Sequence, residues 1–192
     1  MRRRLAAALI TRYSDLATGK PTFDLSAALE ILDSSSLEVW GRLKRLGEGD
    51  TMLASKVVKG NAEDRRDATY VRYELLVDKN ARSLTKTADY ELKTFYGQLQ
   101  YIVRIKIPAN QPSLPPSPDI TVIAFGVLQQ CKLTCSHSHG LDMHYYKDMG
   151  SIDVVDVTSI QCLIGRTRWK NEWVIFDRSG PLARGVAEYD DD

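Results

Sequence analysis

The chain has 192 residues, of which 43% are hydrophobic and 27% are charged, a balance typical of a globular protein that buries a core. Its 26 basic and 25 acidic side chains give a net charge of +1, which excludes a protein that holds nucleic acid by overall charge alone. The charge is uneven, because residues 1–107 carry 19 basic and 14 acidic side chains and residues 108–192 carry 7 and 11. A local basic face is therefore compatible with the nearly neutral total.

The sequence gives no sign of a membrane protein or a secreted one. No run of about 18 apolar residues occurs, so we expect no transmembrane helix. The apolar run after the arginines at positions 2–4 is interrupted at 11–13, too early for a signal peptide. The three cysteines, an odd number, indicate a reducing compartment such as the cytoplasm or nucleus.

Two helices are predicted in the first 36 residues. Hydrophobic side chains recur at helical spacing from Met1 to about Leu16. A second, shorter helix follows Asp24, whose side chain is a good N-cap. The segment 37–46 is ambiguous, because Ser35 and Glu38 fit a helical capping box whereas the glycines that follow fit a hairpin. For this segment we favour a strand.

From residue 68 onward the hydrophobic period changes to two, and β-branched and aromatic residues dominate. A loop with four prolines at 110–118 separates two strands, and the last hairpin turns at Lys170 and Asn171. The strands expected after residue 67 span residues 68–77, 92–107, 120–131, 143–147, 152–157, 160–169 and 173–176. We therefore predict an α+β fold, a partly open antiparallel β-barrel over 37–187 with a helical annex at 1–36 and an acidic tail at 188–192.

One cluster of metal-ligating residue types lies at Cys131, Cys135, His137 and His139. Its C-x3-C-x-H-x-H spacing is compressed, and ligands so close together in a loop rarely close a tetrahedral zinc site by themselves. We interpret the segment as a polar connector and expect no metal and no other cofactor.

The sequence also offers little for catalysis. All three histidines, the third being His144, lie within eight positions, and no nucleophile elbow, P-loop or G-x-G-x-x-G motif is present. We expect a protein that is not an enzyme, and keep a hydrolytic or metal-dependent enzyme that uses segment 131–144 as a lesser hypothesis.

Basic residues interleaved with aromatic ones carry the main functional prediction. Such pairs suit phosphate contact combined with base stacking, and a two-stranded hairpin tip is narrow enough to enter a DNA groove. The ordinary alternative is that lysine and arginine protect exposed sheet edges. The expected phosphate contacts are Arg65, Arg66, Arg72, Arg104, Arg166, Arg168 and Lys170, and the candidates for base or methyl contact are Tyr96, Gln98 and Trp169.

The three tryptophans differ in their expected roles. Trp40 and Trp173 are predicted to fill the core, since tryptophan is most often a large core residue. Trp169 lies between two cations beside the turn and is predicted to be exposed.

Several strings resemble a domain of proteins from mushroom-forming fungi that is linked to Kyakuja-Dileera-Zisupton DNA transposons. They include Trp-Gly-Arg at 40–42, Gly-Asp-Thr-Met at 49–52 and Phe-Tyr-Gly-Gln-Leu at 95–99, and further matches lie at 66–73, 155–166 and 173–179. The resemblance covers roughly residues 39–187. It implies a nuclear, double-stranded DNA-binding domain, with a preference for 5-methylcytosine as the finer expectation, because these transposons sit beside 5-methylcytosine oxidases. It carries over no acidic triad of a transposase.

A second likeness is to bromo-adjacent-homology barrels of chromatin proteins. It rests on a valine-rich strand that leads to an Ile-x-Gly turn, as at 160–165 here. This likeness also implies a barrel and a nuclear role, but with a histone or another protein as the partner.

Overall fold

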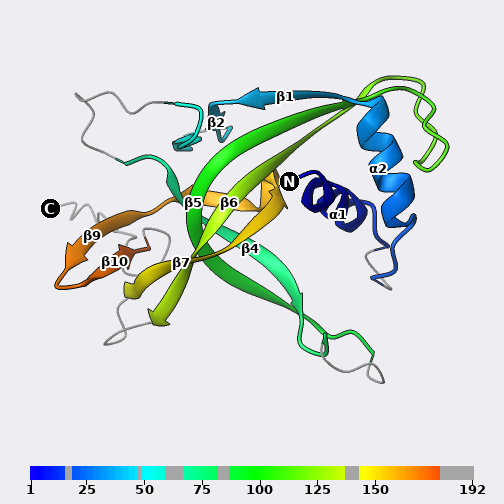
Figure 1. The fold of residues 1–192 in the computed structure, drawn as a ribbon. Helices are drawn as coiled ribbons and strands as arrows, with labels where there is room; N and C mark the ends of the chain where they lie inside the picture. Colours follow the sequence, from blue (N-terminus) through cyan, green and yellow to red (C-terminus); the bar gives the residue numbers. More distant parts are fainter. Residues whose placement is uncertain (16–18, 47–48, 59–66, 82–86, 137–142, 178–192) are drawn as a thin grey trace, which may run out of the picture.

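The computed structural model describes residues 1–15, 19–46, 49–58, 67–81, 87–136 and 143–177 (Figure 1). In this part of the chain two helices precede a large antiparallel sheet. The helices are α1 (Arg2–Arg12) and α2 (Leu25–Ser34). The strands are β1 (Ser36–Trp40), β2 (Arg42–Lys44), β3 (Thr51–Leu53), β4 (Tyr70–Asp78), β5 (Tyr90–Ile107), β6 (Thr121–Cys135), β7 (Met143–Asp156), β8 (Ile160–Leu163), β9 (Gly165–Trp169) and β10 (Glu172–Phe176).

The main sheet has the strand order β8-β4-β5-β6-β7-β10-β9 and curls into a half-barrel. The predicted α+β fold with a partly open antiparallel barrel is therefore confirmed. The two outer strands of this order, β8 and β9, are separated in sequence by Ile164 alone. The chain therefore passes directly from one edge strand of the sheet to the other. Between these strands the amide of Ile164 donates to the carbonyl of Tyr70 at 3.1 Å.

The long strand β5 connects two parts of the structure. Its first half pairs with β4, from Tyr90 opposite Asp78 to Gln98 opposite Tyr70. Its second half pairs on the same edge with β1, and β6 pairs along the other edge. The short β2–β3 hairpin forms a separate two-stranded sheet, and its Met52 lies in a core cluster with Leu99 and Ile102 of β5.

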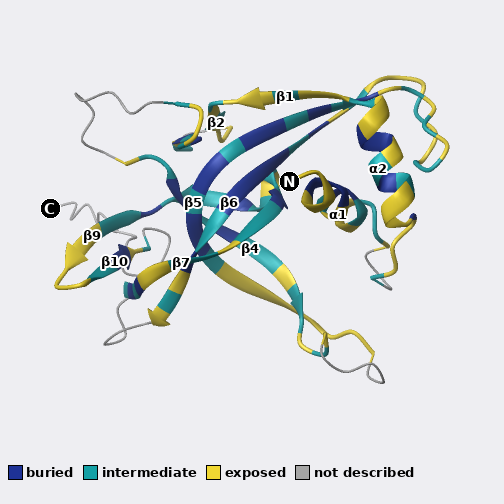
Figure 2. Ribbon diagram, viewed as in Figure 1, coloured by how far each residue is buried: buried dark blue, intermediate teal, exposed yellow. Residues whose placement is uncertain are grey.

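The helices cover one end of the sheet, and the β9–β10 hairpin lies at the opposite end (Figure 1). Leu5 and Leu9 of α1 share a core cluster with Ile105, Ile123 and Phe125 of β5 and β6. The buried stretches of β5 and β6 run through the middle of the molecule in Figure 2. Alternate side chains of β4 enter two further clusters on opposite faces, because successive side chains of a strand point to opposite sides.

Both helices form where the sequence predicts them. The first ends at Arg12, earlier than expected, and the second begins after Asp24, whose carboxylate accepts a hydrogen bond of 2.9 Å from the amide of Ala27. Segment 37–46 is extended, as favoured. The capping-box alternative is wrong, because the Ser35 hydroxyl donates back to the carbonyl of Ile31 at the end of α2.

The strand boundaries differ from expectation in three places. The strands predicted at 143–147 and 152–157 form one continuous strand, β7. Its pairing with β6 contains several register shifts, which allow the strand to continue through the residues between the two predicted segments. The strand predicted at 160–169 divides into β8 and β9, since its first half pairs with β4 and its second half with β10. The short strand β3 is not among the strands predicted from the sequence.

Trp40 is not a core residue. It lies on β1 with 46% of its surface exposed, because β1 pairs only with β5 among the described strands and its side chains stay at the surface. Of the helices in the described ranges, none is long and apolar enough to cross a membrane.

Candidate nucleic-acid interface

Of the predicted DNA contacts in the described part of the chain, three are exposed on the β9–β10 hairpin: Arg168, Trp169 and Lys170. Trp169 pairs with Glu172, so Lys170 and Asn171 form a two-residue turn, as the sequence predicts. Arg168 and Lys170 are exposed, and 60% of the Trp169 surface is accessible. The Nζ atom of Lys170 lies 6.0 Å from the centre of the Trp169 indole. No carboxylate of the described residues pairs with Arg168 or Lys170, so both charges face solvent.

The turn holds Lys170 in an unusual backbone conformation. Its φ of 54° lies in the left-handed region, which glycine and asparagine adopt more easily than a residue with a long side chain. The structure thus places a cation at the tip of the hairpin at a position where a different residue would cost less conformational energy.

Arg166 lies at the base of the hairpin and faces inward. Its guanidinium donates to the hydroxyl of Tyr146 at 2.9 Å and to the carboxylate of Asp67 at 2.7 Å. The guanidinium carbon lies 3.6 Å from the ring centre of Tyr70 and 4.2 Å from that of Trp173. These four partners come from β4, β7, β10 and the segment before β4. Arg166 therefore joins the hairpin to the barrel and orients its tip, while its own charge is already compensated.

The surroundings of Arg166 alter the pKa of several groups. Burial raises the pKa of Asp67, but hydrogen bonds from Thr69 and Arg166 outweigh this, and the net pKa lies below its ordinary 3.8. Burial lowers the pKa of Arg166, and its hydrogen bonds to Tyr146 and Asp67 more than restore it. Burial also raises the pKa of the Tyr146 hydroxyl, and that of the neighbouring Cys131 thiol to about 12. Arg166 consequently remains a cation at any ordinary pH.

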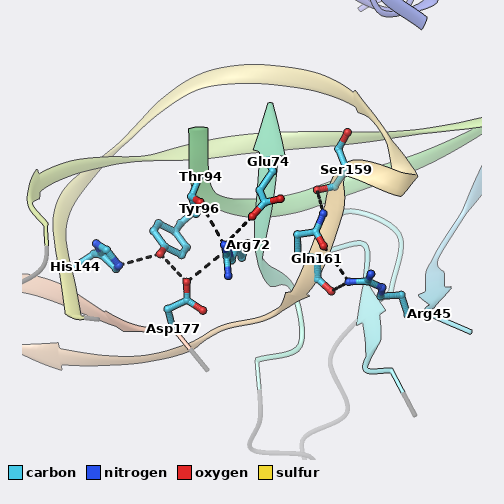
Figure 3. A network of polar contacts seen from close by, with 9 residues as sticks. All are labelled: Arg45, Arg72, Glu74, Thr94, Tyr96, His144, Ser159, Gln161 and Asp177. Atoms are coloured by element: carbon cyan, nitrogen blue, oxygen red, sulfur yellow. Dashed lines mark hydrogen bonds and ion pairs between the residues drawn. The ribbon is translucent and has the colours of Figure 1, made fainter. Parts of the chain in front are cut away.

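Arg72 and Tyr96 belong to an internal polar network (Figure 3). Arg72 forms ion pairs with Glu74 at 2.7 Å and with Asp177 at 3.6 Å. The Tyr96 hydroxyl donates to Asp177 at 2.8 Å and contacts Nε2 of His144 at 2.8 Å. Only 3% of the Tyr96 surface is exposed. The register places Arg72 opposite Tyr96, so the two residues lie together. Tyr96 is buried, and the partly buried Arg72 is held in ion pairs.

Gln98 and Arg104 are also engaged within the protein. The Gln98 amide donates to the Thr69 hydroxyl at 3.2 Å. Arg104 pairs with Glu38 at 3.0 Å and lies over the Trp40 indole at 5.0 Å. Hydrogen bonds from Lys106 and Arg104 lower the pKa of Glu38 to about 2, so this one carboxylate is ionised and is shared by the two cations. Arg65 and Arg66, also predicted as phosphate contacts, lie outside the described residues.

Two further cations were not predicted as contacts. Arg42 and Lys44 are exposed on β2 and pair with no carboxylate in the described ranges. The neighbouring Arg45 donates to the backbone carbonyl of Gln161 on β8, which places this short hairpin beside the strand that leads into β9. The sequence around Arg42 and Lys44 does not indicate that they lie near β8. That proximity depends on the contact between Arg45 and Gln161, which are 116 positions apart.

The residues considered for metal binding and catalysis do not converge in the described part of the chain. Cys131 is buried and Cys135 is exposed, whereas His137 and His139 lie outside the described residues. Among the residues that are described, no group of three or more histidine, cysteine or acidic side chains could hold a metal ion. His144 is buried against Tyr96, with ring centres 4.7 Å apart.

A cavity of about 390 Å³ lies between α1 and the sheet, away from the hairpin. Its floor is apolar, formed by residues such as Leu75 and Val155. Its ionisable residues are Arg12 and Asp156, which pair with each other. The cavity is therefore separate from the β9–β10 hairpin, and Arg12, the basic residue of its described lining, is paired with Asp156.

Comparison with known proteins gives no match to a protein-family model, to a curated protein or to a solved structure.

Proposed function

We propose that this protein is a double-stranded DNA-binding module without enzymatic activity, and that it contacts DNA through the tip of the β9–β10 hairpin. The observation that carries the proposal is the pair Arg168 and Lys170, which flanks the exposed Trp169 and has no carboxylate partner among the described residues. Three cations assigned to DNA from sequence, Arg72, Arg104 and Arg166, have carboxylate partners within the protein. Arg168 and Lys170 have none in the ranges that the structure describes.

The geometry suits a duplex in two respects. A two-stranded ribbon fits the major groove of B-form DNA, and the cations at its tip can reach the phosphates on either side. The indole of Trp169 offers an apolar face for the methyl group of a pyrimidine or for a partly unstacked base. Arg166 keeps the hairpin oriented, which lowers the entropy lost on binding.

The number of cations without a carboxylate partner among the described residues sets the expected salt dependence of binding. Two phosphate contacts contribute about −1.8 to the slope of log K against log salt for B-form DNA. Binding that also uses Arg42 and Lys44 would be steeper, with about −0.9 for each additional contact. This modest electrostatic contribution agrees with the net charge of +1.

The preference for 5-methylcytosine and the link to fungal transposons belong to the same proposal, and their support is the resemblance of residues 39–187 to the transposon-associated domain. DNA as the ligand would place the protein in the nucleus. A methyl group in the major groove would lie within reach of a hairpin that enters there.

A mobility-shift assay with matched duplexes tests the proposal. Unmethylated and 5-methylcytosine duplexes, the corresponding single strands and RNA are compared at one salt concentration. We expect the duplexes to bind most tightly and the methylated one to be preferred. Affinity weaker than about 10 μM for all ligands, in the non-specific range, would contradict DNA binding.

A specific observation favours the alternative of a protein partner such as a histone. Leu76 and Leu92 face each other across β4 and β5 and are 60% and 61% exposed. Exposed apolar side chains that lie together are a candidate contact for a protein partner. If the alternative holds, histone peptides will bind and Leu76→Ser with Leu92→Ser will weaken that binding, while duplex DNA will not compete.

A further inference from the structure

The carboxylate of Asp177 lies in a site built by strands of the barrel (Figure 3). Its Oδ2 atom accepts a hydrogen bond from the Tyr96 hydroxyl at 2.8 Å and forms an ion pair with Nε of Arg72 at 3.6 Å. Tyr96 and Arg72 are opposite one another on β5 and β4. Asp177 directly follows Phe176, the last residue of β10. The carboxylate thus comes from beyond a strand end, whereas the groups that hold it are fixed in the sheet.

His144 orients the main donor of this site. A tyrosine hydroxyl has one proton, and here that proton goes to Asp177, because an ionised carboxylate can only accept. The 2.8 Å contact between the Tyr96 hydroxyl and Nε2 of His144 therefore requires a proton on Nε2, donated to the tyrosine oxygen. Both rings are 3% exposed, so neither can turn freely toward water.

The burial of Asp177 shows that the site compensates a negative charge. Its side chain is only 7% exposed, and a carboxylate removed from water is costly unless donors and a cation replace its hydration. Arg72 supplies the charge, although it also pairs with Glu74 at 2.7 Å. The Tyr96 hydroxyl supplies a directed hydrogen bond. Together they have the chemistry of a receptor for one carboxylate group.

We propose that Arg72, Tyr96 and His144 form a carboxylate-binding site whose present occupant is the protein's own Asp177. The site would accept a small free carboxylate when the Asp177 side chain is removed. In the intact chain it would accept an acidic group of a partner that displaces the end of β10. This inference is independent of DNA binding, since it concerns buried groups and not the hairpin tip.

Chemical rescue tests the site. Asp177→Ala removes the carboxylate but keeps Cβ, which leaves space of the size of formate. Thermal unfolding of the whole chain is followed in sodium formate and in sodium chloride at equal ionic strength and pH 7. We expect Asp177→Ala to melt below the original protein in chloride. At about ten times its dissociation constant, formate should raise the melting temperature of this variant by roughly 3–5 °C.

Two controls make the test specific. The original protein should show no rise, because Asp177 already fills the site, and the double variant Asp177→Ala with Tyr96→Phe should show none, because the directed donor is lost. An equal rise in all three proteins, or no rise in Asp177→Ala, would overturn the proposal. If Asp177→Ala is unfolded in chloride, recovery of its far-ultraviolet circular dichroism in formate supports the site, and no recovery contradicts it.

Discussion

The guanidinium of Arg166 lies over the ring of Tyr70 in a cation–π contact, with its carbon atom 3.6 Å from the ring centre. This contact joins the β9–β10 hairpin to strand β4. The second ring at 4.2 Å, that of Trp173, lies on the hairpin itself. A planar guanidinium can contact two rings and still donate to Asp67 and Tyr146, which an ammonium cannot do with the same geometry.

Arg166→Lys should therefore destabilise the protein although it keeps the charge. We expect a loss of about 1–2 kcal/mol from the weaker ring contacts and one lost hydrogen bond, and about 2–4 kcal/mol for Arg166→Ala, which leaves Asp67 without its cation. Denaturant unfolding measures both values. Equal stabilities of Arg166→Lys and the original protein would show that the stacked geometry contributes nothing.

Lys170→Asn should separate stability from DNA binding. Asparagine adopts a φ of 54° with less strain than lysine, so the variant should gain up to about 1 kcal/mol in unfolding free energy. It also removes one cation, so the salt dependence of DNA binding should become shallower by about 0.9. Lys93→Asn is the control, because Lys93 is an exposed lysine on β5 far from the hairpin turn in sequence. It should neither raise the unfolding free energy nor make the salt dependence of DNA binding shallower. A variant that binds DNA with an unchanged slope would remove Lys170 from the interface.

Asp67 predicts a dependence of stability on pH. Its pKa is lower in the folded protein than the ordinary 3.8, so its ionised form stabilises the fold, fully above about pH 3.8 and progressively less as the pH falls through the folded value. Asp67→Asn should cost about 1 kcal/mol at pH 7, a value limited by partial exposure of the carboxylate. The difference between variant and original should shrink below pH 3.8 in urea titrations at several pH values. A constant difference from pH 7 to pH 2 is the contrary outcome.

The cysteines should differ in reactivity. Burial raises the pKa of Cys131 to about 12, so at pH 8 only about one molecule in ten thousand carries this thiolate, whereas Cys135 is exposed. Iodoacetamide should label Cys135 in the native protein and Cys131 only after unfolding, as peptide mass spectrometry can determine. Comparable labelling of both cysteines in the native state would contradict the burial of Cys131.

Local sequence signals account well for the helices, the barrel strands and the turn at Lys170. The period of two marks strands such as β5, Asp24 caps α2, and an exposed tryptophan is expected beside the turn. These features depend on residues that are close in the chain, so short-range patterns carry them.

The use of the arginines could not be predicted in the same way. Arg166 is bound by Asp67, which lies 99 positions away, and Tyr96 by Asp177, 81 positions away. Whether a strand arginine faces solvent or an internal carboxylate depends on which distant strand becomes its neighbour. The exposure of Trp40 has a similar cause, because it follows from the place of β1 along the edge of β5.

The proposed binding of duplex DNA by the hairpin tip is tested most directly by the salt dependence of affinity. Fluorescence anisotropy with a labelled duplex from 50 to 300 mM salt compares the original protein, Arg168→Ala with Lys170→Ala, and the control Arg3→Ala with Arg4→Ala. The control removes two exposed cations from α1, at the opposite end of the molecule (Figure 1). We predict that the hairpin variant binds more weakly and that its salt slope is shallower by about 1.8, while the control matches the original. A hairpin variant with unchanged affinity and slope at every salt concentration would contradict the proposal.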